Sequence, residues 1–425
     1  MSLNPQDAAC LDRIDGDALV ARAAQWAQIN SGSRNRPGLE RMLAALKPEL
    51  ERLGGEVETT PLPTVTEVGA DGVVRSVESA PALRLRLRPE ATTQVALTGH
   101  YDTVYPADSP FQTVTTRADG ALNGPGIADM KGGLSVMIGA LAAFETHADA
   151  HRVGWTVLIS PDEETGSLGS APLLAELGAR AHVGLTFEPA LADGRLASAR
   201  KGSENFHLVV WGRSAHAGRA FAEGRNAVAA AARAAVALHA LNGRREGVTV
   251  NVARIDGGAP LNQVPDAAVV RFNLRLPDEA AGVWALAEFD RITAETAADG
   301  VTAELHGGLT RPPKPFVPAQ QALFEAARDA AGELGQTLDW QPSGGVCEGN
   351  NLFAAGCPGV DTLGVRGGDI HSEAEHAWPD SFAERARLTT LLLIRLATGE
   401  IDGPGLRAAL GRDLSLGVTP VVSLG

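Results

Sequence analysis

The order of short apolar runs and one long apolar segment constrains the fold of this chain more than any other feature. Val95–Thr98, Trp155–Ser160 and Val183–Phe187 are apolar runs bounded by turn residues, as strands buried on both faces are. Gly132–His147 lies between the first two runs and has the length and composition of a buried helix. This strand–helix–strand alternation predicts an α/β fold with a mostly parallel sheet flanked by helices.

A second pattern begins near residue 203. The expected elements are strands at Asn205–Gly212, Val248–Ile255, Ala267–Leu276 and Val301–Leu305, and helices at Asn226–Leu241 and Asp278–Ala298. Their order, β-α-β-β-α-β, is ferredoxin-like. The Pro-rich stretch Arg311–Pro318 marks the exit, and alternation then resumes with a strand at Val360–Val365. We therefore predict an α/β domain formed by residues 1–200 and 311–425, interrupted by an inserted α+β domain at 201–310.

Composition limits which binding partners and which cellular compartment are expected. A length of 425 residues favours two domains, and a net charge of −14 argues against nucleic acid or an anionic membrane as a partner. Three scattered cysteines cannot form a disulfide framework, which favours a reducing compartment. The N-terminus has no apolar segment of the secretory type, and we find no run of 18 apolar residues, so the expected location is the cytoplasm.

Segments that carry acids or histidines follow four of the predicted strands directly. These segments are Gly99–Thr103, Pro161–Gly166, Glu188–Ala190 and Gly367–His371. A fifth segment, Gly124–Gly133, enters the long helix, and its glycines permit tight turns around Asp129. Ligands of open parallel sheets bind beyond the carboxyl ends of the strands, so these segments are expected to converge. Each is commonplace alone, and their coincidence in one domain favours a site.

The side chains in these segments are of the kinds that bind divalent metals. The donors are His100, Asp129, Glu164, Glu188 and His371. Imidazole and carboxylate suit Zn²⁺, Mn²⁺ or Co²⁺, and three protein ligands per ion leave room for water. Five donors suffice for two ions only if one carboxylate bridges them, which gives a pair about 3.5–4 Å apart. Asp102 is placed to accept the second ring N–H of His100 and so fix its tautomer.

The motifs GHYDTV, GPGIADMKGG, PDEETGS, FEPA and GGDIH occur in this order. They resemble the motifs of the dinuclear-zinc family of glutamate carboxypeptidase, aminoacylase, acetylornithine deacetylase and succinyl-diaminopimelate desuccinylase. The resemblance runs from about His100 to Glu375, includes the inserted domain, and is closest to the glutamate carboxypeptidase-like branch. It implies amide-bond hydrolysis with two divalent cations, zinc being expected and cobalt or manganese remaining as alternatives. A protein with one metal at rest and a weak second site is a further alternative.

The resemblance also assigns the metal ligands. It implies that His100 and Glu188 bind one ion and that Glu164 and His371 bind the other. Asp129 would bridge the two, with a cis peptide after it. A water bridging the ions would then be the nucleophile.

Further residues receive roles from the same resemblance. Glu163 would be the general base, and Asp102 would orient the metal site. His216, in GRSAHAG of the inserted domain, would stabilise the oxyanion from the partner subunit of a homodimer. Asn262 and Arg275 would hold the free carboxylate of the substrate.

The function expected from these residues is cleavage of the amide bond of N-acyl amino acids or small peptides that carry a free C-terminal carboxylate. Rivals are a deacetylase or desuccinylase of amino-acid biosynthesis, an aminopeptidase, and a catalytically dead binding protein; the complete donor set argues against the last. Arg200 or Lys201 is a further candidate for substrate contact. One segment departs from the family: GGVCEGN replaces Gly-Gly-Thr-Ser-Asp-Gly, and Cys347 and Glu348 leave the specificity pocket undefined.

Overall fold

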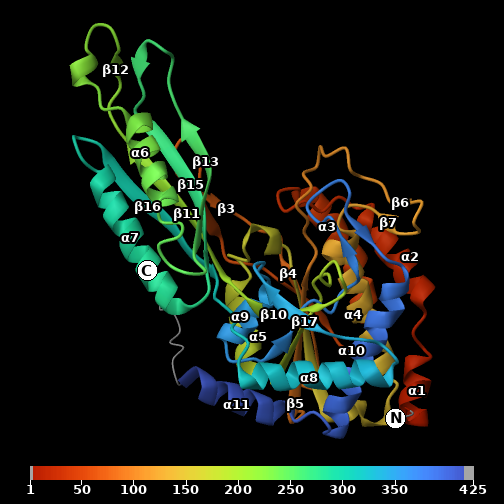
Figure 1. Cartoon of the computed structure of the whole chain (residues 1–425). Helices are drawn as coiled ribbons and strands as arrows, with labels where there is room; N and C mark the ends of the chain where they lie inside the picture. The colour runs from red at the N-terminus through yellow and green to blue at the C-terminus, as the bar shows by residue number, and fades with distance from the viewer. Residues whose placement is uncertain (1–2, 416–425) are drawn as a thin grey trace.

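The computed structural model describes residues 3–415, whose two main sheets have separate hydrophobic cores (Figure 1). The larger sheet has the order β1-β4-β8-β5-β9-β18. Its strands are β1 (Val57–Thr60), β4 (Ala82–Leu87), β8 (Val153–Ser160), β5 (Thr93–His100), β9 (Val183–Thr186) and β18 (Gly359–Val360). The last four strands are parallel to one another. At one edge, β4 pairs antiparallel with β8, and β1 pairs antiparallel with β4. The predicted, mostly parallel sheet is confirmed.

Helices cover both faces of this sheet because its central strands are apolar on both sides. Val95 and Leu97 of β5 face the core built by α2 (Gly16–Ala27), α4 (Gly133–Phe144), α8 (Pro318–Glu333) and α10 (Asp380–Thr398). Ala96 faces the opposite way, toward α5 (Ala171–Arg180) and α9 (Glu348–Ala354). The segment Ile127–Phe144 is long and apolar enough to cross a membrane, but 89% of it is buried inside the protein, as in a core helix.

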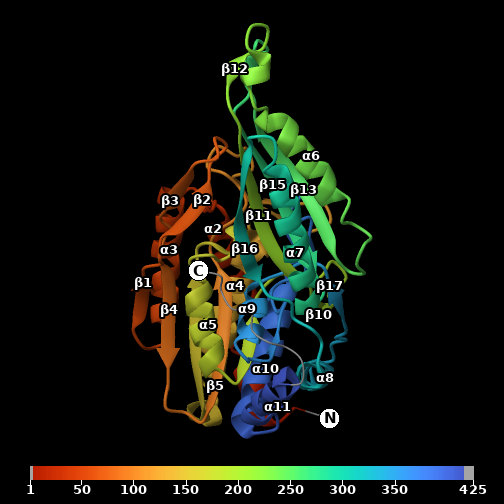
Figure 2. The same cartoon turned by 90° about the vertical axis from the view of Figure 1, so that its left-hand side faces the viewer.

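The second sheet has the order β13-β15-β11-β16, with every neighbouring pair antiparallel. Its elements are β11 (Gly202–Trp211), α6 (Ala227–His239), β13 (Thr249–Gly257), β15 (Ala267–Leu276), α7 (Glu279–Thr296) and β16 (Thr302–Arg311). Both helices cover one face, where Phe206, Phe272 and Phe289 pack with ring centroids 5.0–5.4 Å apart (Figure 2). This is the expected ferredoxin-like arrangement.

The other face of the second sheet contacts the first part of the chain. A hairpin of β2 (Val65–Val68) and β3 (Val74–Val77) places Val68 against Val209 and Val269. At the far end of the second sheet, β12 (Ala215–His216) and β14 (Gln263–Val264) belong to two separate loops and pair antiparallel. This two-stranded unit, named the distal hairpin, projects away from the larger sheet (Figure 1).

Several element boundaries differ from the prediction. The strand expected at Val301–Leu305 continues to Arg311, so the expected linker begins inside a strand. The strand expected at Val360–Val365 ends at Val360, because Thr362 has a φ of 62° and breaks the extended backbone. The unassigned C-terminal segment forms α11 (Gly403–Ser415), and its residues 416–425 lie outside the described residues. The domain boundaries at 200 and 311 stay a prediction.

Candidate metal centre

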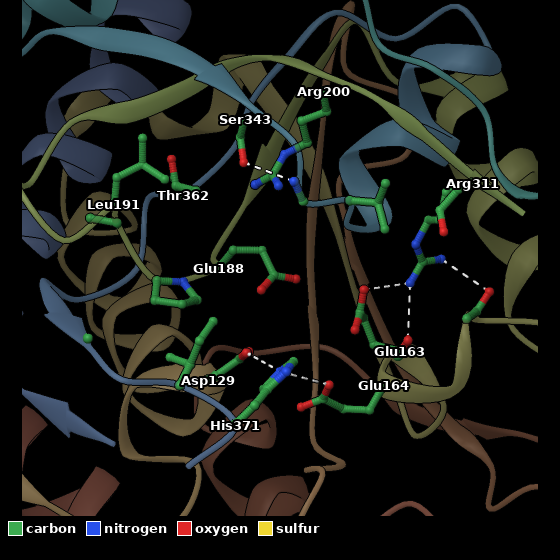
Figure 3. Close-up of a pocket in the computed structure, with 18 of the residues that line it drawn as sticks. Asp129, Glu163, Glu164, Glu188, Leu191, Arg200, Arg311, Ser343, Thr362 and His371 are labelled. Carbon is green, nitrogen blue, oxygen red and sulfur yellow. Dashed lines mark hydrogen bonds and ion pairs between the residues drawn. The ribbon is translucent and has the colours of Figure 1, made fainter. Parts of the chain in front are cut away.

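The five predicted metal ligands lie together at the carboxyl edge of the larger sheet, four of them labelled in Figure 3. His100 ends β5, Glu164 lies in the turn after β8, and Glu188 comes two residues after β9. Asp129 lies in the turn Ile127–Gly132 that leads into α4, and the peptide bond after it is cis, as the resemblance implies. His371 follows the short strand β19 (Gly367–Gly368). Parallel strand order thus brings His100, Glu164 and Glu188 to one edge of the sheet. Asp129 and His371 reach the same place from other segments, because the strand expected directly before Gly367–His371 ends at Val360 and β19 belongs to a separate antiparallel sheet.

Asp129 lies between the two histidines. Its Oδ1 is 3.1 Å from His100 Nε2, and its Oδ2 is 3.3 Å from His371 Nε2. His371 Nε2 is also 3.2 Å from Glu164 Oε2, and His100 Nε2 is 3.9 Å from Glu188 Oε1. Each carboxylate oxygen of Asp129 therefore faces a different imidazole, which is the arrangement that a bridging ligand requires.

Burial and charge make this cluster fit divalent cations. Glu164 Oε1 and Glu188 Oε1 are buried and find no hydrogen-bond partner among residues 3–415. Burial and the charge of Asp129 raise the pKa of Glu164 to about 8, and the same causes raise the pKa of Glu188. Hydrogen bonds to Asp129 and Glu164 raise the pKa of His371 to about 10. Crowded buried carboxylates with free lone pairs need positive charge, and two divalent ions would supply it.

Asp102 connects the first histidine to the turn after β8. His100 Nδ1 lies 3.1 Å from the Asp102 carbonyl oxygen and 3.3 Å from its Oδ1. The Asp102 carboxylate also accepts the backbone N–H groups of Glu163 and Glu164, each at 3.2 Å, and the Ser33 hydroxyl at 2.7 Å. A side chain with these contacts fixes the ring of His100 relative to both glutamates.

Glu163 lies beside the cluster, and a buried arginine holds its carboxylate. Arg311 Nη2 donates to Glu163 Oε1 at 2.5 Å (Figure 3). Sequence analysis missed this partner because it assigned Arg311 to a linker. The single hint in the sequence is a charged residue directly before two prolines, where the backbone is restricted.

Glu375 is a second residue that sequence analysis missed, and it holds the turn that carries Asp129. Its Oε1 accepts the N–H groups of Ala128 and Asp129 at 2.9 and 3.0 Å. Its Oε2 accepts the N–H of Gly126 at 3.0 Å and the Tyr105 hydroxyl at 2.6 Å. Because Glu375 is four residues after His371, it ties the two loops that carry these ligands to each other.

A cavity of about 550 Å³ opens from the cluster of metal-donor residues. Asp129, Glu164 and His371 line one end, and Arg200 and Ser343 line the other, with Glu188 between them (Figure 3). The cavity therefore has an acidic end and a basic end. Such polarity suits a ligand with an anionic group at the basic end, away from the metal-donor residues.

Two guanidinium groups flank the turn at Gly344 and Gly345. Arg275 also lines the cavity, and its Nη1 lies 3.5 Å from the Gly344 carbonyl oxygen. A Cβ at Gly345 would lie 3.7 Å from Arg200 Nη1, an ordinary van der Waals distance, so the Arg200 guanidinium lies directly beside this turn. Lys201, the other candidate near the hinge, donates instead to the Gly247 carbonyl at 2.6 Å.

The positive charge of Arg200 is only partly neutralised by its neighbours, so this side chain can bind an anionic ligand. Its Nε donates to Asp361 Oδ2 at 2.7 Å, and Lys314 Nζ donates to the same oxygen at 2.7 Å. One carboxylate thus serves two cations, all three groups being buried. The excess positive charge makes this end of the cavity suitable for an anion.

The departure at Cys347 and Glu348 lies beneath the site rather than in its wall. Both side chains are fully buried, and neither lines the cavity. Ser160 donates its hydroxyl to Glu348 Oε1 at 2.5 Å, and burial raises the pKa of Glu348 to about 8. Cys347 Sγ accepts the N–H of Gly349 at 3.3 Å and so caps α9. The wall of the cavity here is formed by Ser343, Gly345 and Val346.

Two predicted residues lie away from the cavity in this chain. His216 belongs to the distal hairpin, and the N–H of the following Ala217 donates to the Asn262 carbonyl oxygen at 2.8 Å. The distal hairpin projects from the end of the second sheet that is remote from the larger sheet (Figure 1). Neither His216 nor Asn262 lines the cavity, whereas Arg275 does. The roles of all these residues stay predictions.

Comparison with known proteins agrees with this geometry. The family described as Peptidase family M20/M25/M40 matches residues 96–395. Carboxypeptidase G2 of Pseudomonas sp. (strain RS-16) is 26% identical over 393 residues, which cover 90% of each chain. A succinyl-diaminopimelate desuccinylase of Gluconacetobacter diazotrophicus is 28% identical over 302 residues, which cover 65% of this chain and 74% of that protein.

Solved structures share the fold. A tripeptidase from Staphylococcus aureus superposes with a TM-score of 0.71 at 23% identity, covering 91% of this chain and 99% of that chain. An M20 family metallo-carboxypeptidase from Sulfolobus solfataricus has a TM-score of 0.68 at 17% identity, covering 88% and 98%. The family match spans more than half of the sequence, and the resemblance read from the motifs is confirmed. The chain belongs to peptidase family M20/M25/M40, and it is a hydrolase of peptide or amide bonds.

Proposed function

We propose that this hydrolase releases an amino acid from N-acyl amino acids or short peptides that carry a free C-terminal carboxylate. One observation supports this above all: a single cavity has the metal-donor cluster at one end and two arginines at the other. A substrate whose carboxylate lies at the arginines would place its amide bond toward the metal cluster. The scissile bond is thus selected by its distance from a free carboxylate.

The cations would be two zinc ions per chain, with cobalt and manganese as alternatives. His100 and Glu188 would hold one ion, Glu164 and His371 the other, and Asp129 both. When bound, these ions would lower the pKa of the attacking water and polarise the carbonyl group of the substrate.

Glu163 would be the general base. Its carboxylate lines the cavity next to Glu164, within reach of a water at the metal cluster. It would take a proton from the attacking water and deliver that proton to the leaving amine, so one group serves both transfers. With Arg311 on Oε1, the second oxygen of Glu163 is the one left to act.

Arg275 would hold the substrate carboxylate through two parallel hydrogen bonds, because a guanidinium presents a planar fork. Arg200 would place a second guanidinium at the same end. A desuccinylase is the main alternative, and it rests on the relatives and not on Arg200, because the carboxylate of a succinyl group lies on the opposite side of the amide bond from the amino-acid carboxylate. The curated relatives include several proteins named succinyl-diaminopimelate desuccinylase.

A homodimer through the inserted domain would complete the site. His216 of the partner subunit would donate to the oxyanion, and the partner's Asn262 would contact the substrate. The hairpin region that carries them also exposes two large apolar side chains: Phe221 is 67% exposed, and Leu261 is fully exposed. Apolar groups in such positions suit an interface.

The three cysteines are free and buried, which favours the reducing cytoplasm as the location of this protein.

A substrate panel tests this function directly. The purified chain is assayed with Zn²⁺, Co²⁺ or Mn²⁺ on N-acetyl and N-succinyl amino acids, on dipeptides, and on the same dipeptides amidated at the C-terminus. We expect turnover of the free-carboxylate compounds, loss of turnover on amidation, and about two metal ions per chain by elemental analysis. Turnover that requires a free N-terminus and ignores C-terminal amidation would favour an aminopeptidase. An inactive chain without bound metal would favour the binding protein.

A further inference from the structure

Arg311 joins the second sheet to the carboxylate proposed as the general base. It is the last residue of the edge strand β16, yet only 1% of the residue is exposed, because the side chain enters the α/β part of the molecule. Its Nη2 donates to Glu163 Oε1 at 2.5 Å and lies 3.3 Å from the Glu163 carbonyl oxygen. Its Nη1 donates to Asn351 Oδ1, in α9, at 3.0 Å. One guanidinium therefore contacts the turn after β8 and a helix of the larger domain.

The backbone around Arg311 is held as firmly as its side chain. Pro312 and Pro313 follow directly, which restricts the backbone of Arg311 to extended conformations. Asn350 donates its side-chain N–H to the Pro312 carbonyl oxygen at 2.7 Å. A Cβ on Gly202 would lie 3.1 Å from the Arg311 carbonyl oxygen, so the first and last strands of the second sheet meet here in close contact. Movement of the second sheet must therefore act on Arg311.

Glu163 depends on this contact for its orientation. Within residues 3–415, Arg311 is the one cation that lies within ion-pair distance of the Glu163 side chain. Both side chains are largely buried, with exposures of 1% and 12%, so the pair is formed with little competition from solvent. Arg311 occupies Oε1, which leaves Oε2 as the proton acceptor. A planar fork that contacts both the carboxylate and the backbone of one residue fixes the rotamer of that residue.

We propose that Arg311 is a positioning residue that sets the orientation of the Glu163 carboxylate according to how the second sheet is seated on the α/β domain. The inference rests on the proposed function, because it takes Glu163 to be the base. The guanidinium touches neither the donor cluster nor the basic end of the cavity, and it acts through Glu163. Its effect is therefore expected in the chemical step rather than in the binding of metal or substrate.

The test uses Arg311→Met, Arg311→Lys and a matched control, Arg385→Met, in the full chain loaded with Zn²⁺ or Co²⁺. Arg385 is also a buried arginine, at 2% exposure, but it donates to the Gly194 carbonyl away from Glu163. With the best substrate of the panel, Arg311→Met is expected to lower kcat about 100-fold, as small misplacements of a reacting group do. Its KM and metal content stay close to the wild-type values. Arg311→Lys restores part of kcat, and Arg385→Met retains kcat.

A thermal double-mutant cycle supplies a readout that needs no activity. Glu163→Gln and Arg311→Met are expected to lower the melting temperature non-additively, since each single change leaves its buried partner uncompensated. Arg311→Gln replaces Arg311→Met if the latter does not fold. A folded, metal-loaded Arg311 variant with wild-type or higher kcat overturns the inference, as does an additive cycle. If the wild-type chain hydrolyses no compound of the panel, the proposed function is wrong. The double-mutant cycle still reports in that case whether the two side chains interact.

Discussion

The cavity and the distal hairpin both carry predicted site residues. Those at the cavity are brought together within one chain, whereas those at the hairpin are exposed and lie away from the cavity. At the cavity, His100 and His371 come from segments far apart in sequence, and a ring nitrogen of each lies within 3.3 Å of an Asp129 carboxylate oxygen in one chain. At the hairpin, His216 and Asn262 are exposed and do not line the cavity, and β12 lies at the end of the second sheet remote from the larger sheet (Figure 1). The same resemblance assigned both groups to one reaction.

The two groups differ in how firmly the surrounding structure holds them. His100, Glu164 and Glu188 lie at or just after the ends of strands that are buried on both faces. Asp102 contacts His100 and the turn that carries Glu164, and Glu375 holds the turn that carries Asp129. The hairpin has no comparable support within residues 3–415, since His216 pairs with Gln263 across a two-residue strand and is exposed. The first group is therefore complete in one chain, whereas the second can take part only if another chain brings it to the cavity.

The largest effect is expected from a change at Glu163, which tests whether the cavity can lose catalysis and still bind metal. Glu163→Gln keeps the size of the side chain and removes its basicity, so kcat should fall about 10⁴-fold, at the top of the range for a general base. Elemental analysis should still find the wild-type metal content, because Glu163 is not among the proposed ligands. Steady-state kinetics on the best substrate measure the loss. A variant with full turnover would remove Glu163 from the mechanism.

The next effect tests whether the hairpin acts in a second chain. His216→Ala should lower kcat about 10²–10³-fold, as the loss of one oxyanion donor does. Mixing this variant with Glu163→Gln should recover about a quarter of wild-type turnover, because half of the randomly exchanged dimers then hold one intact site. Recovery after subunit exchange, followed by kinetics and by light scattering, is the measurement. A monomeric chain with unaffected kcat in His216→Ala would leave the hairpin without a catalytic role.

The sequence predicted one of these regions far better than the other. His100, Glu164 and Glu188 were found because they follow apolar strands, and strand order alone brings such positions together. Strand order does not predict where His216 lies, because the direction of a loop at the end of a sheet does not follow from the order of the strands. Its role came from resemblance alone.

The supporting residues were missed for a different physical reason. Glu375 lies 246 residues from the Asp129 N–H that it accepts, and the surrounding sequence SEAEHA is that of an ordinary polar loop. Arg311 ends a strand whose glycine-rich half lacks the alternation that marks strands, so only tertiary structure reveals its partner. Residues that orient others have no motif of their own, because any donor or acceptor with suitable reach can serve.

A smaller effect tests the rigidity of the cavity end. Glu375→Gln keeps the shape of the side chain but replaces one of its two acceptor oxygens with a donor, which faces either the backbone N–H groups or the Tyr105 hydroxyl. We expect the affinity for Zn²⁺ to fall about 10–100-fold, as it does when other supports of metal ligands are removed. Competition with a chromophoric chelator measures the change. Tyr105→Phe, which leaves the three backbone contacts of Glu375 intact, is the matched control and should change the affinity less. Unchanged affinity in Glu375→Gln would mean that the turn around Asp129 holds its shape without this carboxylate.

The smallest effect compares the two predicted carboxylate-binding residues, one in each region. Arg275→Ala should raise KM about tenfold for free-carboxylate substrates and change kcat little, because hydrogen bonds to a charged group are worth about 1.5–3 kcal/mol. Arg275→Lys keeps the charge without the planar fork and should fall between the two. Asn262→Ala should raise KM in the dimer only, and subunit exchange with wild-type chains should restore it in part. Amidated substrates provide the control, since they lack the group that Arg275 binds. An equal loss on free and amidated substrates would show that Arg275 shapes the cavity without contacting the carboxylate, and the basic end of the cavity would then have to act through Arg200.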